Sequence, residues 1–175
     1  RNCKLKITGN IPYYITGKLL RILSELHSKP DLCVFTVQKE VAERIIAKPP
    51  KMNRLSAIVR FWTEPEIISV IPRKDFDPQP KVDSAIIKFC VRRQASSVKS
   101  SDYYRTVKML FAQPRKTILN NLMRDAKLQT YANAANKEGV FKSLQKLGIN
   151  PNDRPQNLNM EKIINISGWL KYYKT

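Results

Sequence analysis

Two kinds of apolar repeat run along the first part of the chain, and each predicts a different element. Leu32 to Val37 is an apolar run of strand length, of the kind buried on both faces in a parallel sheet. Thr16 to Ser28 instead carries apolar side chains at helical spacing. A short strand-like segment, Leu5 to Thr8, precedes that helix. These segments predict a strand, helix, strand unit with parallel strands.

The pattern continues with two more helices and two more strands. Lys39 to Ala47 and Arg54 to Trp62 carry helical faces. Glu66 to Ile71 and Val82 to Val91 read as strands joined by the loop Pro72 to Lys81. The predicted fold class is therefore α/β, with parallel strands and a closing antiparallel hairpin.

The strand signals stop at a polar segment, residues 94–101, which predicts a linker. Beyond it, Asp102 is expected to cap a helix that places Tyr104 on its apolar face. Further helical faces occupy 118–122, 140–147 and 163–170. The chain is thus predicted to contain an α/β domain over 1–93 and a small all-helical domain over 102–175.

The composition describes a folded and strongly basic protein. Lys and Arg number 32 against 14 Asp and Glu in 175 residues, a formal net charge of +18, while 42% of residues are hydrophobic. Such an excess predicts a polyanionic partner, with a solvated basic surface as the alternative. Only five glycines occur, and they form no glycine-rich phosphate-binding loop.

Cysteine and histidine usage points to a chain without disulfides or metal. Cys3, Cys33 and Cys90 are odd in number and widely spaced, so we expect buried, reduced thiols in an intracellular protein. His27 has no Cys or His nearby, which argues against a metal site. No apolar run approaches the roughly 18 residues of a membrane span, so no membrane partner is expected.

The segment Asn10-Ile11-Pro12-Tyr13 lies where a strand gives way to a helix, at the edge where α/β sheets bind ligands. Chemistry at an exocyclic amine such as adenine N6 needs two acceptors for the amino hydrogens and an aromatic face for the base. The Asn10 side chain and the Ile11 carbonyl supply acceptors, Pro12 stiffens the turn, and Tyr13 supplies the ring. The alternative is an ordinary turn with structural tyrosines.

Phe76 is the single aromatic residue of the proline-rich loop between the last two predicted strands. A lone Phe beside Pro and Lys is typical of a clamp that stacks on a base. The alternative is a Phe that folds back to cover the edge of the core.

Six segments together resemble the ribosomal RNA adenine dimethyltransferases, across essentially the whole chain. Within that family they are most similar to the bacterial members that dimethylate two adjacent adenines near the 3′ end of small-subunit (16S) rRNA. The segments are Asn10–Tyr13, Phe35–Arg44, Arg54–Ser56, Phe76–Ala85, Phe111–Ile118 and Gly148–Leu158. Asn-x-Pro-Tyr alone is shared with many amino-group methyltransferases, so the combination carries the resemblance.

The resemblance implies the C-terminal half of a Rossmann-like class I methyltransferase domain that uses S-adenosylmethionine. Asn10 would accept an N6 hydrogen and lie beside the cofactor, and the Ile11 carbonyl would be the second acceptor. Tyr13 would stack on the adenine, Phe76 would close on its other face, and Pro12 would hold the turn.

The sequence departs from the family in two places. The family's glycine-rich cofactor loop and two cofactor-binding acids precede the matching segments and do not occur in these 175 residues. We therefore expect an N-terminally truncated chain that is inactive alone, binds S-adenosylmethionine weakly or not at all, and would be an enzyme when full length. Pro114 stands where the family usually has a basic residue.

The basic residues expected to contact RNA fall into two groups: Arg54, Arg73, Lys74 and Lys81 near the rim of the site, and Arg115 and Lys116 in the helical domain. The resemblance implies small-subunit rRNA or a 30S precursor as the partner of a monomer. It also implies a cytoplasmic protein, or a mitochondrial or nucleolar one in a eukaryote.

Two other functions stay open. One is a non-catalytic relative that binds nucleic acid as a ribosome assembly factor or a transcription factor. The other is a resistance methylase acting on one adenine of 23S rRNA. The intact Asn10–Tyr13 turn with Phe76 favours an enzyme over a non-catalytic relative. The segments Phe111–Ile118 and Asp153–Leu158 argue against a resistance methylase.

Overall fold

The computed structural model describes residues 5–92, 97–125, 128 and 135–173 of the chain. The chain divides into two compact units. The first contains residues 1–47 and 58–94, and the second contains residues 48–57 and 95–175.

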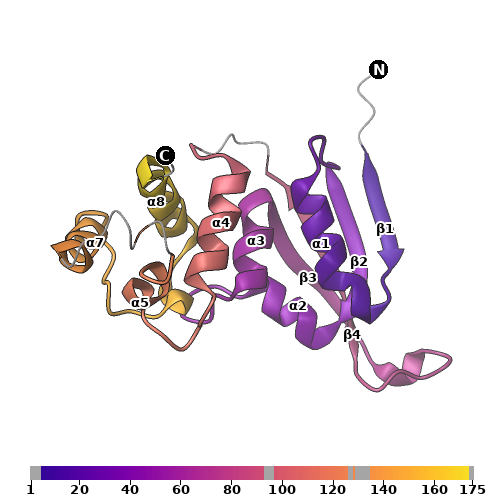
Figure 1. Cartoon of the computed structure of the whole chain (residues 1–175). Helices are drawn as coiled ribbons and strands as arrows, with labels where there is room; N and C mark the ends of the chain where they lie inside the picture. Colours follow the sequence, from indigo (N-terminus) through magenta and orange to yellow (C-terminus); the bar gives the residue numbers. More distant parts are fainter. Residues whose placement is uncertain (1–4, 93–96, 126–127, 129–134, 174–175) are drawn as a thin grey trace. The chain divides into compact units, whose positions relative to one another are not determined.

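The first unit is built on a four-stranded sheet with the order β1-β2-β4-β3. Its strands are β1 (Lys6–Asn10), β2 (Leu32–Gln38), β3 (Thr63–Ile71) and β4 (Ser84–Val91). β1 and β2 are parallel, whereas β4 runs antiparallel to both β2 and β3 (Figure 1). The predicted α/β class, with a parallel pair and a closing antiparallel hairpin, is confirmed.

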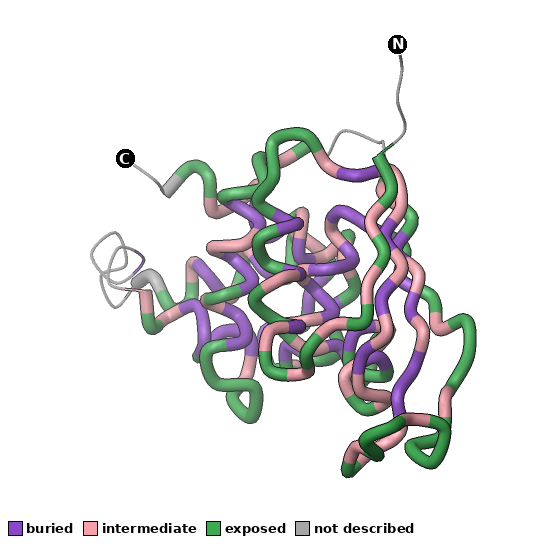
Figure 2. Tube along the Cα trace, turned by 90° about the vertical axis from the view of Figure 1, so that its right-hand side faces the viewer, coloured by how far each residue is buried: buried purple, intermediate pink, exposed green. Residues whose placement is uncertain are grey.

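Helices α1 (Thr16–Glu25) and α2 (Lys39–Ile46) follow β1 and β2 in the chain, and α2 packs against β2, β3 and β4. The core lies along the middle strands, where buried and partly exposed residues alternate (Figure 2). The Phe89 ring lies 5.7 Å from that of Phe35 and is stacked on Trp62 at 6.5 Å. These apolar contacts fix the strands whose ends carry the site.

The prediction of buried thiols is correct for Cys33 and wrong for Cys90. Cys33 is fully buried, and this burial raises the pKa of its thiol to about 11. Cys90 follows the buried Phe89 on β4, so the alternation of a strand turns it to the opposite, exposed face. Cys3 lies outside the described residues.

Arg60, on helix α3 (Arg54–Trp62), is only 6% exposed although it carries a charge. Its Nε donates to the carbonyl of Ala47 at 3.1 Å, and its Nη2 donates to the carbonyl of Ile46. Its Nη1 pairs with Glu64 at 3.1 Å. Arg60 therefore satisfies carbonyls left over at the end of α2.

In the second unit, the elements that the structure describes are helical. They are α4 (Ser100–Leu110), α5 (Ile118–Leu122), α7 (Ala135–Lys146), the short η3 (Pro155–Asn157), α8 (Met160–Leu170) and η4 (Lys171–Tyr173). α4 packs against α8 and α5. Gly148 has φ +70° just after α7, a conformation that glycine adopts without strain. In the part of the chain that the structure describes, no helix has the length and apolar content to cross a membrane.

The first helix of this unit begins earlier than predicted. α4 starts at Ser100 with Lys99 at its N-cap position, so Asp102 lies in the first turn rather than capping it, and the predicted linker 94–101 overlaps the helix. Tyr103, with no exposed surface, shares the buried face of α4 with Val107 and Leu110, whereas the predicted core residue Tyr104 is half-buried. Burial raises the pKa of Tyr103 above its usual value.

Residues 48–57 group with the helical unit rather than with the α/β unit to which the predicted boundary at residue 93 assigns them. The Met52 N–H donates to the Gln156 carbonyl at 3.1 Å. The buried Tyr103 hydroxyl donates to the Ala57 carbonyl at 3.0 Å. Helix α3 accordingly begins in the second unit and ends in the first.

Candidate functional site

The turn that leaves β1 is fixed on both sides of the Ile11 carbonyl. The Ile11 N–H donates to the Thr36 carbonyl of β2 at 3.1 Å, and the Pro12 carbonyl accepts from the Ile15 N–H at 3.0 Å. Pro12 has φ −53° and ψ 129°, and it leads into the single turn η1 (Tyr13–Ile15). Asn10, the last residue of β1, is exposed at the edge of the sheet. The turn therefore presents its polar groups from a rigid backbone.

One cavity of about 270 Å³ brings the predicted site residues together. It is lined by Asn10, Ile11, Pro12, Tyr13, Phe76, Pro78 and Pro80. The β1–α1 turn supplies the polar groups and Tyr13, while the β3–β4 loop supplies Phe76 and two proline rings. This combination of acceptors with flat apolar surfaces suits a planar heteroaromatic ligand that carries hydrogen-bond donors.

Tyr13 is held by a residue that the sequence interpretation gave no role. The Tyr13 hydroxyl oxygen lies 2.8 Å from Oγ of Ser84, a hydrogen-bonding distance. Ser84 is the first residue of β4 and has no exposed surface. Ser84 thus fixes Tyr13 through its hydroxyl group, although it belongs to no catalytic motif in the sequence.

The loop that carries Phe76 is anchored at its base by Asp83. The Arg73 N–H donates to Asp83 Oδ1 at 3.0 Å, and the Lys39 N–H donates to the Asp83 carbonyl at 3.0 Å. Within the loop, the Phe76 N–H donates to the Arg73 carbonyl at 3.3 Å, beside the short helix η2 (Arg73–Asp75). The loop extends beyond the end of the sheet (Figure 1). Asp83 was not singled out from the sequence.

The predicted RNA contacts of the first unit lie outside the first cavity. Arg73 and Lys81 line a second, polar space of about 520 Å³ together with Lys39, Glu40, Glu43, Val82 and Asp83. Lys74 is exposed on η2. The second space mixes acidic and basic side chains, so only part of its charge is available to a phosphate group.

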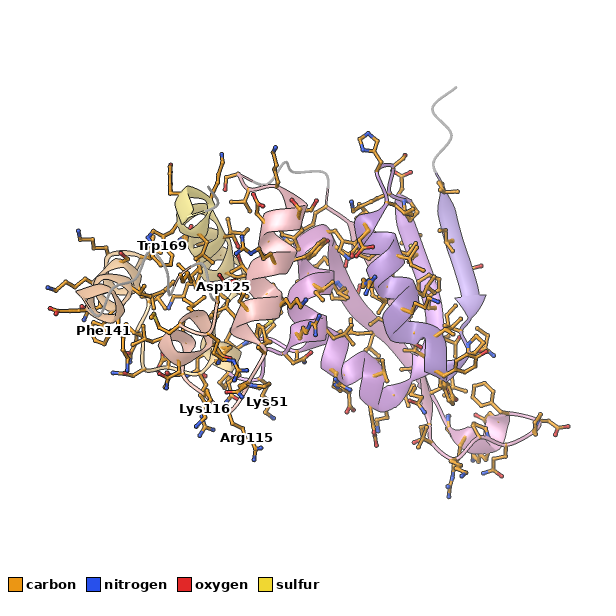
Figure 3. The ribbon with its side chains drawn as sticks, viewed as in Figure 1. Lys51, Arg115, Lys116, Asp125, Phe141 and Trp169 are labelled. Carbon is orange, nitrogen blue, oxygen red and sulfur yellow. The ribbon has the colours of Figure 1, made fainter. Side chains whose placement is uncertain are left out.

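The remaining predicted contacts belong to the second unit. Arg115 and Lys116 are exposed on the loop before α5 and line a space of about 530 Å³ with Ala112, Gln113 and Pro114. Figure 3 shows both side chains pointing away from the helices. Arg54, expected near the rim of the site, is the exposed first residue of α3 in the second unit and lines neither cavity of the first.

Comparison with known proteins gives a consistent set of relatives. The family model described as ribosomal RNA adenine dimethylase matches residues 1–171. The "Ribosomal RNA small subunit methyltransferase A" of Dehalococcoides mccartyi (strain ATCC BAA-2266 / KCTC 15142 / 195) is 37% identical over 164 residues, which cover 93% of this chain and 54% of that protein. The chain thus spans about half the length of this curated relative.

Solved structures share the fold. A dimethyladenosine transferase from Plasmodium falciparum superimposes with a TM-score of 0.81 at 22% identity, over 97% of this chain and 67% of that one. The 23S rRNA methyltransferase ErmE gives a TM-score of 0.68 at 21% identity, over 95% of this chain and 65% of that one. The Rossmann-like character of the α/β unit is therefore shown.

Proposed function

The chain belongs to the ribosomal RNA adenine dimethylase family, and from this we propose that the full-length protein methylates N6 of two adjacent adenosines near the 3′ end of small-subunit rRNA. The observation that carries the proposal is the single cavity shared by Asn10, Ile11, Tyr13 and Phe76. Similarity to a protein named a small-subunit methyltransferase supports the choice of RNA.

The β1–α1 turn provides the two acceptors that an adenine amino group requires. Asn10 Oδ1 and the Ile11 carbonyl each accept one N6 hydrogen, which orients the nitrogen lone pair. Because the Ile11 N–H and the Pro12 carbonyl are already bonded within the protein, the carbonyl between them keeps its direction. These two hydrogen bonds also stabilise the positive charge that develops on N6 as it is methylated.

Tyr13 and Phe76 provide the flat surfaces of the site. One ring comes from the rigid turn and the other from the β3–β4 loop, so a base that leaves its helix can be enclosed between them. Aromatic faces also stabilise positive charge as it develops on the nitrogen. This geometry needs no strong general base among the residues of the cavity.

Among the residues of the cavity, Asn10 is the one whose carboxamide we expect to lie against S-adenosylmethionine, beside the adenine amino group that it orients. When bound, S-adenosylmethionine supplies an electrophilic methyl group on a sulfonium. The contribution of these residues is to orient the adenine and to exclude water from its amino group.

Basic residues of both units position the RNA. Arg73, Lys74 and Lys81 lie on or beside the β3–β4 loop, and Arg54, Arg115 and Lys116 lie on the helical unit. Contacts with phosphates fix the register of the RNA, while the cavity selects the base. The partner is small-subunit rRNA or its 30S precursor, and the protein acts as a monomer in the cytoplasm.

The test is Asn10→Ala in the full-length protein, assayed with 30S precursor particles. Methyl incorporation at the two adenosines should fall by at least about a hundredfold, while RNA affinity should change by less than about twofold. Thr8→Ala, an exposed change two residues earlier on β1, is the matched control. Undiminished methylation by Asn10→Ala would refute the proposed role, and a wild-type protein that binds RNA but transfers no methyl group would favour the non-catalytic function. Methylation of a single 23S adenine would favour the resistance methylases.

A further inference from the structure

Asn121, on α5, is 1% exposed, yet its carboxamide is used entirely by the loop that precedes its helix. Its Oδ1 accepts from the Gln113 N–H at 2.9 Å. Its Nδ2 donates to the carbonyls of Gln113 at 2.9 Å, Thr117 at 3.0 Å and Lys116 at 3.3 Å. One buried side chain therefore joins the beginning of the loop to its end.

The loop itself is a tight turn stiffened by proline. The Lys116 N–H donates to the Gln113 carbonyl at 2.9 Å, which closes a four-residue β-turn. Pro114 occupies the second position of that turn, where its fixed φ is favourable. Pro114 thus removes one positive charge relative to the family pattern but adds rigidity.

The end of the loop is fixed as well. Thr117 Oγ1 accepts from the Asn120 N–H at 3.2 Å and caps α5. The Ile118 N–H donates to the Asp153 carbonyl at 2.8 Å. The backbone around Arg115 and Lys116 is held at both ends, although both side chains are exposed (Figure 3).

We propose that Asn121 is a positioning residue for RNA, which holds the Gln113–Thr117 turn so that Arg115 and Lys116 meet neighbouring phosphates of one RNA segment. The inference rests on the proposed RNA contact of these two residues. A turn that is ordered before binding loses less conformational freedom on binding, so affinity rises without any contact between Asn121 and RNA.

Asn121→Asp is the sharpest change, because it preserves size and the acceptor for the Gln113 N–H. It removes the donors and sets a carboxylate against the three carbonyls that Asn121 now bonds. We expect the Kd for 30S precursor RNA to rise about tenfold, with kcat at saturating RNA unchanged. Asn120→Ala, on the exposed face of the same helix, is the matched control and should leave Kd unchanged.

Pro114→Gly tests the same idea without touching the buried side chain. Pro114 is exposed, so the variant keeps the core and every charge while loosening the turn. It should raise Kd for RNA several-fold. Because Pro114 lies on the surface, we expect this variant to keep the fold, so it tests the proposal even if Asn121→Asp fails to fold.

The decisive measurement combines these changes with Arg115→Ala/Lys116→Ala. If Asn121 acts through the two cations, Asn121→Asp and Pro114→Gly should cause no further loss of RNA affinity in that background. Additive losses, or unchanged affinity in both variants, would overturn the positioning role while leaving the RNA contact in place. If Arg115→Ala/Lys116→Ala leaves RNA affinity unchanged, these two residues do not contact RNA. The positioning role of Asn121 is then refuted as well. Methyl transfer at the Asn10 cavity is tested separately by Asn10→Ala.

Discussion

The Tyr13 hydroxyl oxygen lies 2.8 Å from Oγ of Ser84, and this pair links the two chain segments that enclose the cavity. Tyr13 belongs to the turn after β1, whereas Ser84 begins the strand that emerges from the Phe76 loop. The preceding residue, Asp83, closes the base of that loop through its bond to the Arg73 N–H. Two consecutive residues, Asp83 and Ser84, therefore hold both aromatic walls.

The first prediction concerns this hydroxyl pair. Tyr13→Phe and Ser84→Ala should each lower kcat/KM for rRNA about fivefold, because each removes a hydrogen bond of about 1 kcal/mol that fixes the Tyr13 ring. The double variant should lose no more than either single one, as expected when both changes break the same bond. Single-turnover methylation assays of the full-length protein provide the measurement. Tyr14→Phe, at the neighbouring tyrosine that is 90% exposed, is the control, and independent effects of Tyr13→Phe and Ser84→Ala would contradict the coupling.

The second prediction concerns Asp83 and Phe76. Phe76→Ala should lower kcat/KM about 5- to 150-fold, which corresponds to the roughly 1–3 kcal/mol of one aromatic stacking contact with a base. Asp83→Ala should lower it about tenfold by releasing the loop, and it should add little to Phe76→Ala. Asp83→Asn retains the acceptor for the Arg73 N–H and should remain near wild type. Asp77→Ala, at an exposed acid of the same loop, controls for charge, and full activity of Asp83→Ala would exclude the anchoring role.

The elements and the cavity-lining turn could be read from the sequence because their signals are local. Helix α3 occupies the predicted Arg54–Trp62, because the apolar spacing that predicts it lies within one short segment. The grouping of 48–57 with the helical unit depends instead on bonds such as Met52 N–H to the Gln156 carbonyl, which join residues far apart in sequence. The spacing of apolar residues along the chain does not reveal a hydrogen bond between residues so far apart.

Supporting residues were missed for a related reason. Ser84 and Asn121 are buried polar residues whose partners become visible only after folding. On sequence alone a serine at the start of a strand or an asparagine in a short helix has many structural uses. Cys90 was misplaced because an apolar run does not say which of its alternate side chains face the core.

The third prediction concerns stability and Arg60. Arg60→Met should lower the free energy of unfolding by about 2–3 kcal/mol, because the carbonyls of Ile46 and Ala47 lose their donor in a buried setting. Denaturant unfolding of the full-length protein measures the change. Arg21→Met is the matched control, since the Arg21–Glu25 pair has both side chains more than half exposed and should contribute less than about 0.5 kcal/mol. Equal losses in the two variants would show that the carbonyl bonds of Arg60 contribute nothing specific.

The fourth prediction uses salt to count the cations of the helical unit that meet RNA. A protein that neutralises phosphates releases counterions, so log K falls linearly with log salt, with a slope of about 0.7 to 0.9 per phosphate. Arg115→Ala/Lys116→Ala should therefore reduce the slope by about 1.5 if both side chains contact phosphates. Lys142→Gln, in the same unit, is the matched control because its ammonium already pairs with Glu138 at 2.7 Å. The Glu138 carboxylate, whose pKa this pairing lowers, lies beside the Lys142 ammonium and repels a phosphate there, so the slope of Lys142→Gln should match that of the wild type. An unchanged slope in Arg115→Ala/Lys116→Ala would mean that the loop before α5 does not meet the phosphate backbone, and that the basic charge acts through other residues.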